Sequence, residues 1–585
     1  MKLQKGLNTQ RKASWLGASL GFLMMSAAAY GATVLSDIPV ASESVTPPTI
    51  VFTADDSGSM LRTYTPEAIP KIEGGCPTPT DSQGTCVTDI QDAVSGDPAD
   101  IFQKGQPPML AAAFNGLAYN PAVEYRPPMK GDGTSYPNQT NYSYVGWPSD
   151  LDNWGTGKPQ PVNLKDKKYS YKKSVLEGLA KIYNFTIPSG YDDGTNYNLP
   201  PHYFVASFKW CSSSLSTNCV DEYDTQHQVP QYSKGKFELV VLDFKSGMIS
   251  DELTNYANWV AYYRSRAAAS KTVASLAFND AVCHLGDKDC EAAALPYVTY
   301  MSINNTSPAT PARFSGADRT AFSKTLLSTT IKGGTPLTRV ANEVGQLFRN
   351  SNTYIRNSCH RNYHIMFTDG LWNTWSTTVG DVDGAKVPQS FPVASLETPY
   401  GTLIPGKDWP NPIRDTHKND STLSDIALYY WMTDLRPNEP NNVLPTTADP
   451  ATWQHLNFVG MGFGVRGTLT AQDVENIKNG ISGYQWPSIP TGSMTTASVD
   501  YIQTVDDLWH ASFNGFGKYV ATDSPDIFGN ELYSILRGIL TMGSTRTGLS
   551  LTSPLIAKGD VYSYSASFTS ATEGEIVKKS MDAEG

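Results

Sequence analysis

The chain has 585 residues and a formal net charge of −11 at pH 7, from 45 Lys and Arg against 56 Asp and Glu. No segment carries a basic stripe, which argues against nucleic-acid binding. Charged residues make up only 17% of the chain, and Gly, Pro, Tyr and Trp are plentiful. This composition excludes a coiled coil and a disordered chain, and favours an exported, loop-rich protein with β structure.

The first 32 residues have the pattern of a secretory signal peptide. Four basic residues precede an apolar run that begins at Trp15, and small residues suited to cleavage follow that run. A membrane anchor is the alternative, but the apolar run is shorter than the ~20 residues that a spanning helix needs. We therefore expect residues 1–32 to direct export and residues 33–48 to form a short linker.

A strand and a polar turn open the folded part of the chain. The apolar run Ile50-Val51-Phe52 precedes a D-x-S-x-S pattern whose polar positions are Asp55, Ser57 and Ser59. One carboxylate and two hydroxyls at this spacing can converge on a hard cation if the chain turns after the strand. The alternative is a polar strand-to-helix turn, in which Asp, Ser and Gly are common.

Residues 62–320 differ in character from the rest of the chain. The first hundred of them are rich in Pro, Gly, Asn, Asp and Tyr, and two candidate strands follow at His202–Lys209 and Phe237–Leu242. A helix is expected from Glu252, with two arginines, Arg264 and Arg266, that could pair with carboxylates. We interpret 62–320 as an inserted subdomain of strands and loops.

The seven cysteines form three close pairs and one remainder. In an exported protein such pairs favour local disulfides that close loops. Zinc binding is less consistent with their spacing. Cys359 is the remainder, and is either a buried thiol or an intermolecular or redox-responsive one. The expected disulfide residues are Cys76 with Cys86, Cys211 with Cys219, and Cys283 with Cys290.

Two later segments also carry polar residues at element ends. Gly333-Gly334-Thr335-Pro336-Leu337 places Thr335 before an amphipathic helix, where its hydroxyl could reach an ion or could serve only as an N-cap. The apolar run Tyr363–Phe367 ends in Thr368-Asp369-Gly370. Ligands of open α/β sheets bind beyond the carboxyl ends of strands, so Asp369 would share an edge with Asp55, unless it is simply a turn residue.

Strand and helix patterns alternate through the second half of the chain. We expect helices at Thr422–Leu435, Ala471–Asn479 and Ile527–Met542, and a buried strand at Asn457–Val465. This alternation predicts a mostly parallel α/β sheet with helices on both faces. Residues 546–585 have the alternation of strands, and we expect them to begin a β module that the chain does not complete.

Two further details of this half have more than one interpretation. Trp372 and Trp375 could lie at the rim of a site or could fill the top of the sheet. Asp381-Val382-Asp383-Gly384 could be a minor cation loop, although it lacks the further ligands of a twelve-residue calcium loop.

Taken together, Asp55, Ser57, Ser59, Thr335 and Asp369 resemble the metal-ion-dependent adhesion site of von Willebrand factor A domains. The parts of that pattern, D-x-S-x-S, a threonine in a G-G-T-P loop and an aspartate in T-D-G, occur in the family's order. The resemblance implies a von Willebrand factor A-like doubly wound sheet over 49–545, interrupted by 62–320. It also implies a divalent cation, Mg²⁺ first, with Mn²⁺ or Ca²⁺ as alternatives.

Three further stretches resemble PilY/PilC-type type IV pilus tip proteins. With D-D-S-G-S-M and G-G-T-P-L they match the N-terminal half of that family, which usually continues into a C-terminal β-propeller. The stretches are N-W-x-x-Y-Y-R-S-R from Asn258, S-D-I-A with T-D-L-R-P from Ser424, and D-D-L-W-H-A with N-G from Asp506.

The resemblance implies an exported adhesin at the pilus tip or cell surface that also supports pilus biogenesis. Its partners would be pilin subunits or minor pilins and a host-cell or abiotic surface ligand. The alternative is a purely structural role in pilus assembly or tip capping, in which the ion only stabilises the fold.

We expect no enzymatic activity. The zinc-protease pattern H-E-x-x-H is absent, and a G-x-S-x-G match at Gly17, Ser19 and Gly21 lies within the signal peptide. Cys359 and His360 are adjacent, which does not make a catalytic pair.

Overall fold

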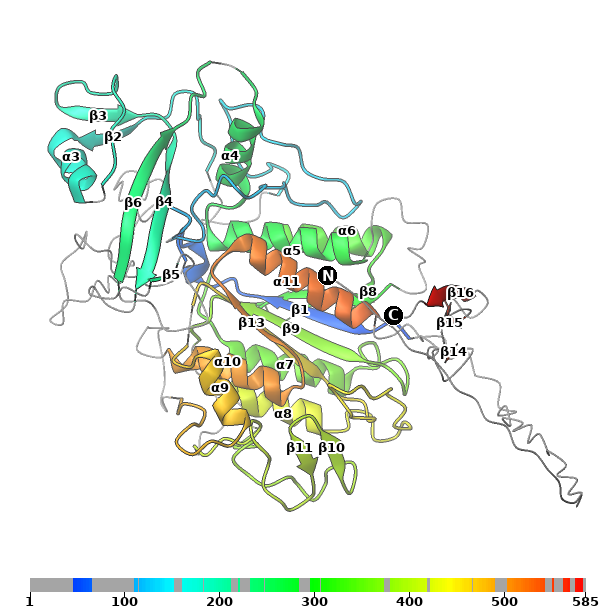
Figure 1. Cartoon of the computed structure of the whole chain (residues 1–585). Helices are drawn as coiled ribbons and strands as arrows, with labels where there is room; N and C mark the ends of the chain where they lie inside the picture. The colour runs from blue at the N-terminus through cyan, green and yellow to red at the C-terminus, as the bar shows by residue number, and fades with distance from the viewer. Residues whose placement is uncertain are drawn as a thin grey trace, which may run out of the picture. The chain divides into compact units, whose positions relative to one another are not determined.

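The centre of the computed structural model is a six-stranded, mostly parallel β-sheet with helices on both faces (Figure 1). Across the sheet the strands follow the order β13-β12-β9-β1-β7-β8. Every neighbouring pair is parallel except β7 with β8. The strands are β1 (Thr49–Ala54), β7 (Tyr297–Ser302), β8 (Ala312–Arg313), β9 (Asn362–Thr368), β12 (Asn457–Phe463) and β13 (Tyr519–Thr522).

The chain divides into two units, Met1–Glu43 and Ser44–Gly585, and the described residues all lie in the second. They are residues 46–65, 110–113, 115–151, 160–182, 184–211, 219–220, 232–246, 248–282, 295–305, 307–372, 379–417, 421–465, 467–489, 502–541, 550–551, 561–568 and 574–581. The expected signal peptide lies outside them. Within this described part, no helix combines the length and the apolar character needed to cross a membrane.

The central strands are buried on both faces, as a parallel sheet requires. Every residue of β1, β9 and β12 is buried. Successive side chains of a strand point to opposite faces, and β1 shows the result: Ile50 and Phe52 belong to one hydrophobic cluster and Val51 to another. Their apolar runs therefore predict a doubly wound sheet rather than a sheet with one wet face.

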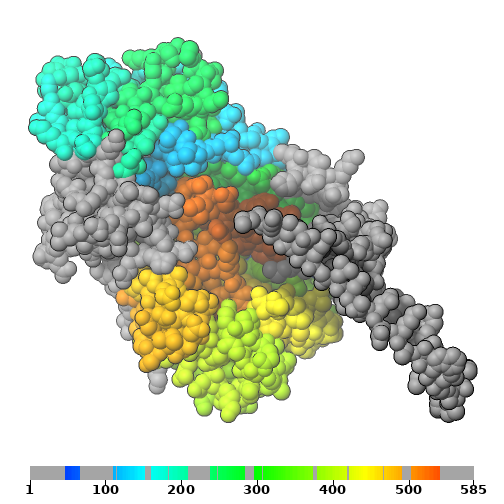
Figure 2. All heavy atoms as spheres, viewed as in Figure 1, coloured from blue at the N-terminus to red at the C-terminus, as the bar shows by residue number. Residues whose placement is uncertain are grey.

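Each face of the sheet is covered by its own helices (Figure 1). One cluster contains side chains of α5, α6 and α11, and the other contains side chains of α7, α8 and α10. Figure 2 shows α11, in orange, at the surface on its side of the molecule. The helices are α5 (Arg266–Val282), α6 (Gly316–Ser328), α7 (Leu337–Asn350), α8 (Leu423–Met432), α9 (Ala471–Lys478), α10 (Gln503–Asn514) and α11 (Pro525–Thr541).

The described part of the region between β1 and α5 is mostly strands and loops, with the helices α3 and α4. Helix α4 (Asp251–Tyr262) presents Tyr256 and Trp259 to Tyr119, with ring centroids 5.0 and 5.9 Å away. Its other elements are η1 (Gly58–Leu61), α3 (Lys173–Ile182), the β2–β3 pair (Tyr169–Lys172 and Asn196–Leu199) and the β5-β4-β6 sheet (Cys219–Val220, His202–Cys211 and Tyr232–Val241).

The range expected for the insertion, 62–320, also contains parts of the main fold. Strand β7 pairs with β1 along its whole length, and α5 and α6 contribute to the core on the sheet. The range 62–320 thus includes a strand of the central sheet. The strands between β1 and α5 belong to smaller sheets and not to the central sheet. That these residues form a separate domain remains a proposal.

Two smaller antiparallel sheets lie in the second half of the chain. One is the β10–β11 pair (Leu396–Thr398 and Gly401–Leu403). The other consists of β14 (Ser550–Leu551), β15 (Val561–Phe568) and β16 (Gly574–Met581), within the range where the alternation predicted strands.

Of the expected disulfide residues, Cys211 and Cys219 are direct partners in the pairing of β4 with β5. The other four, Cys76, Cys86, Cys283 and Cys290, lie outside the described residues. These disulfides remain a prediction.

Candidate functional site

The two predicted aspartates follow neighbouring parallel strands at the same edge of the sheet. Strand β1 ends at Ala54 and β9 at Thr368, so Asp55 and Asp369 both stand at carboxyl ends. The backbone N–H of Asp55 donates to the carbonyl of Phe367 at 2.9 Å. The order of strands reverses between β1 and β9, and crevices at such switch points bind ligands in open α/β sheets.

The Gly-Gly-Thr loop meets the D-x-S-x-S turn at this edge. The N–H of Gly58 donates to the carbonyl of Gly333 at 3.4 Å. Gly333 has a φ of 85°, a conformation that favours glycine. Thr335 is buried, and the N-cap of α7 is Pro336 rather than Thr335. The alternative interpretation of Thr335 as the N-cap was therefore wrong.

Asn304, which the sequence analysis missed, ties these two segments together. It follows β7 at the same edge of the sheet. Its backbone N and Nδ2 donate to Asp56 Oδ1 at 3.0 and 2.9 Å, and Nδ2 also donates to the carbonyl of Gly334 at 2.8 Å. The signal that could have found it is its position directly after a buried strand that ends at this edge.

Hydroxyl and backbone donors orient the first carboxylate. Asp55 Oδ1 accepts from the N–H of Ser57 at 2.8 Å, and Oδ2 accepts from Thr368 Oγ1 at 2.7 Å. The hydroxyls of Ser57 and Ser59 lie 2.9 Å apart. Asp55 and Ser57 are buried, whereas Ser59 is half-buried and Gly58 is exposed. The turn therefore forms the solvent-facing side of a buried cluster of oxygen atoms.

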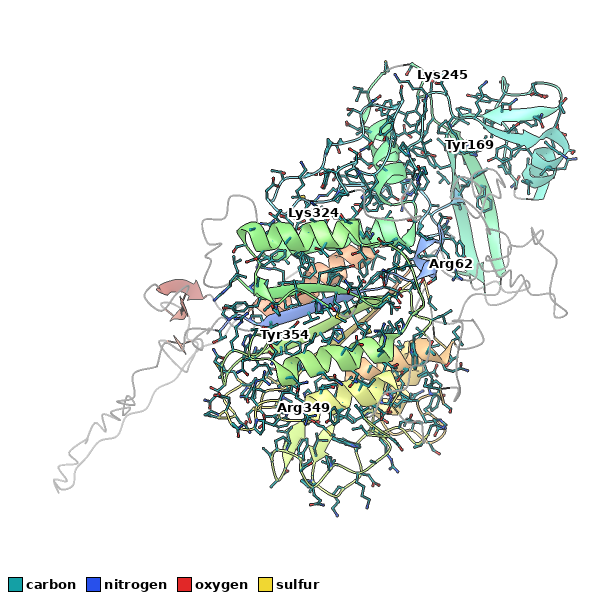
Figure 3. The ribbon with its side chains drawn as sticks, turned by 180° about the vertical axis from the view of Figure 1, so that it is seen from behind. Arg62, Tyr169, Lys245, Lys324, Arg349 and Tyr354 are labelled. Carbon is teal, nitrogen blue, oxygen red and sulfur yellow. The ribbon has the colours of Figure 1, made fainter. Side chains whose placement is uncertain are left out.

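Negative charge accumulates at this edge. Burial raises the pKa of Asp55 to about 7, and repulsion from Asp369 adds to the shift, although hydrogen bonds from Ser57 and Thr368 oppose it. Arg266, one of the two arginines expected to pair with carboxylates, lies with Nη1 3.1 Å from Asp369 Oδ2, and both side chains are buried. Figure 3 shows Arg62, at the C-cap of η1, at the end of the sheet opposite Tyr354.

A second group of aspartates lies at the start of α8. Ligand atoms of Asp381, Asp383 and Asp425 lie within 4.8 Å of one another, so this triad could hold a metal ion. It includes the D-V-D-G segment singled out in the sequence. Asn514 donates to Asp383 Oδ2 at 2.9 Å, and Asp507 accepts from the first two N–H groups of α8 at 2.9 and 3.2 Å.

The hydrogen bonds of Asp425 show that this second group also has a structural role. Its two oxygens accept from the N–H groups of Val382 and Asp383 and from the N–H and hydroxyl of Thr422, at 2.6–3.2 Å. The S-D-I-A and D-D-L-W-H-A stretches of the sequence thus meet here and fix the start of α8 to α10 and to the loop at Asp381.

The remaining candidate residues have simpler positions. Trp372 is buried and donates its Nε1 to the carbonyl of Thr504 at 3.0 Å, so it fills space beside the sheet rather than forming a rim. Trp375 lies outside the described residues. Cys359 is a free, half-buried thiol 3.4 Å from Asn357 Oδ1.

Comparison with known proteins identifies relatives that match more than nine-tenths of this chain. The type IV pilus biogenesis factor PilY1 of Pseudomonas aeruginosa strain PAK is 25% identical over 587 residues, which cover 92% of this chain. The protein of the same name from strain UCBPP-PA14 is 26% identical over 604 residues, which cover 95% of this chain. The chain is homologous to PilY1. The resemblance to PilY/PilC-type proteins is therefore confirmed, and these relatives are named as biogenesis factors, not as enzymes.

The match covers most of this chain but less than half of each relative. The chain spans 42% and 44% of the length of these two relatives. No family model matches the chain. Among solved structures, the pilus adhesin SpaC of Lactobacillus rhamnosus GG in its open conformation gives a TM-score of 0.23 at 12% identity, over 51% of this chain and 33% of that one, an overlap too weak to inform the fold or the function.

Proposed function

We propose that this chain is an adhesin and biogenesis factor of type IV pili whose von Willebrand factor A-like domain binds partners through a divalent cation. The proposed metal ligands are Asp55, Ser57, Ser59, Thr335 and Asp369. The names of the PilY1 relatives support the pilus role. Export to the pilus tip or cell surface, with pilins or minor pilins and a host-cell or abiotic surface ligand as partners, follows from that role.

The observation that carries the metal site is the convergence of three separated segments. Backbone hydrogen bonds join Asp55 to Phe367 and Gly58 to Gly333. The order β8-β7-β1-β9-β12-β13, with an antiparallel edge strand, supports a doubly wound domain whose switch point lies at these residues.

The donor set fits a hard cation. All five side chains offer oxygen atoms, and two of them are carboxylates, which suits Mg²⁺ and permits Mn²⁺ or Ca²⁺. Such an ion would supply a local positive charge that can accept a carboxylate from a partner. The half-buried Ser59 and exposed Gly58 support access from solvent at this point. Because the chain is acidic overall, attachment to acidic surfaces by general electrostatics is unfavourable without the ion.

The test is calorimetric titration of the purified chain with Mg²⁺, Mn²⁺ and Ca²⁺. Asp55→Asn and Asp369→Asn should each abolish binding while circular dichroism shows an intact fold. Asp383→Asn is the matched control, because it removes a buried carboxylate from the second aspartate group and should leave this binding unchanged. Loss of binding in Asp383→Asn alone would assign the ion to the triad and refute the proposed site.

The alternative is a structural role in pilus assembly or tip capping. The two roles separate when the Asp55→Asn chain replaces the parent in a piliated strain. Pili that persist without attachment support metal-dependent adhesion, whereas loss of pili supports the structural role.

A further inference from the structure

A buried arginine contacts the candidate metal site. Arg266 is the first residue of α5 and is fully buried. Its Nη1 lies 3.1 Å from Asp369 Oδ2, and its Nε donates to the carbonyl of Tyr64 at 3.0 Å. Its backbone N–H donates to the carbonyl of Arg62 at 2.9 Å. The guanidinium thus joins the segment leaving the D-x-S-x-S turn to the aspartate of Thr-Asp-Gly.

The charge of this arginine matters because of where it lies. A guanidinium stays protonated in proteins, and a buried charge is costly unless an opposite charge is close. Asp55 and Asp369 are both buried and repel each other. Arg266 places one positive charge against Asp369 and offsets part of the negative charge of the pair, so this edge of the sheet can form before an ion binds.

The same charge opposes the binding of a cation. A divalent ion that shares Asp369 with Arg266 would have a unit positive charge as a close neighbour. At about 6 Å, that repulsion weakens binding by roughly tenfold even at the dielectric constant of water, and by more at the lower effective dielectric of a buried site.

We propose that Arg266 is an internal counter-cation of the metal site: it balances the carboxylates when no ion is bound and keeps the affinity for Mg²⁺ low. This inference rests on the proposed metal-binding function. When a partner's carboxylate adds negative charge at the site, the affinity of the site for Mg²⁺ rises. By reciprocity, the ion strengthens binding of that carboxylate by the same factor.

The corner between α4 and α5 also supplies a matched control. Arg264 is buried like Arg266 and lies two residues away, but its Nη2 donates to the carbonyl of Gln160, in the loop region before α3. Arg264→Gln therefore removes a buried guanidinium from the same corner without removing the contact to Asp369.

The experiment measures Mg²⁺ affinity by calorimetry, and melting temperature in EDTA and in excess Mg²⁺, for the parent, Arg266→Gln, Arg266→Lys and Arg264→Gln. Arg266→Gln should bind Mg²⁺ at least tenfold more tightly than the parent. Its melting temperature should fall in EDTA and largely recover in Mg²⁺, because the ion replaces the missing charge. Arg266→Lys keeps the charge and should stay within about threefold of the parent affinity, and Arg264→Gln should show no gain in affinity.

Unchanged or weaker Mg²⁺ binding by folded Arg266→Gln would refute the counter-cation role. So would a variant that stays unfolded even in excess Mg²⁺, since the ion could then not take over the charge. Failure of the underlying function gives a different result: neither the parent nor Arg266→Gln binds Mg²⁺. If the parent binds and Asp55→Asn abolishes that binding, only the claim about Arg266 is at stake.

Discussion

The hydroxyl of Thr368 allows a direct test of whether hydrogen bonds at the end of β9 fix the position of Asp55 in the candidate site. Thr368 is fully buried at the end of β9. Its Oγ1 donates to Asp55 Oδ2 at 2.7 Å and accepts from the N–H of Gly370 at 3.0 Å. Thr368→Val keeps the shape of the side chain and removes both bonds.

The expected cost follows from what is left without a partner. At pH 8, above the pKa of about 7 to which burial and Asp369 raise Asp55, the lost bond is one to a charged carboxylate, worth about 1.5–3 kcal/mol. The buried N–H of Gly370 also loses its acceptor, at a further cost of about 1–3 kcal/mol. We therefore expect Thr368→Val to lower the free energy of unfolding by about 3–5 kcal/mol.

Urea unfolding in EDTA at pH 8, followed by tryptophan fluorescence, measures this difference as a shift in midpoint at constant slope. Thr368→Ser is the control, because it keeps the hydroxyl and loses one buried methyl group, at about 1 kcal/mol. The same pair of variants should separate in Mg²⁺ affinity, with at least a tenfold loss only in Thr368→Val. Equal stability of the two variants would refute the argument that the hydroxyl orients Asp55.

Three further outcomes are expected. Asp507→Ala should destabilise the fold by about 2–4 kcal/mol in thermal or urea unfolding, because two buried N–H groups at the start of α8 lose their acceptor, whereas Asp507→Asn should cost less. Gly370→Ala should cost about 1–3 kcal/mol, because Gly370 has a φ of 101°, and a wild-type melting temperature would contradict this. Burial alone would raise the pKa of Asp449, but His455, 2.7 Å away, lowers it below its usual range. Burial alone would lower the pKa of His455, but Asp449 raises it above its usual range. The stability that ionised Asp449 contributes is lost as pH falls through its folded pKa. The stability that protonated His455 contributes is lost as pH rises through its folded pKa. The stability lost in Asp449→Asn should therefore be largest between about pH 4 and 6.5, and a loss that is flat from pH 4 to 9 would contradict the pairing.

Most strands and helices of the fold were predictable from the sequence, but helix α5 was not. Strands β1, β9 and β12 are apolar runs that end in polar turns, and α8, α9 and α11 lie close to their expected ranges. Helix α5 was missed because almost every one of its residues is buried. A helix without a solvent-facing side has no 3.6-residue polar period to read, so the high helix propensity of its alanines was the remaining signal.

The candidate site shows the same division. The rule that ligands bind beyond carboxyl strand ends brought Asp55 and Asp369 to one edge without knowledge of the strand order. The partners that orient them could not be read in this way. Thr368 was visible in the Thr-Asp-Gly triplet, but its bond to Asp55 depends on the parallel pairing of β1 with β9. Arg266 is separated from Asp369 by about a hundred residues, and only the packing of α5 on the sheet explains their contact.

The two groups of buried aspartates handle their charge in different ways, and this difference indicates where an ion is most needed. At the start of α8, backbone N–H groups and one hydroxyl already occupy the oxygens of two carboxylates: Asp425 accepts four hydrogen bonds and Asp507 two from the helix terminus. An added cation there would compete with bonds that already exist. At the edge of β1 and β9, Asp55 accepts bonds from Ser57 and Thr368, and the nearby positive charge comes from Arg266 through Asp369. A cation at the triad would have to displace the bonds that Asp425 already accepts, so we expect metal titration to be dominated by Asp55 and Asp369 rather than by the triad.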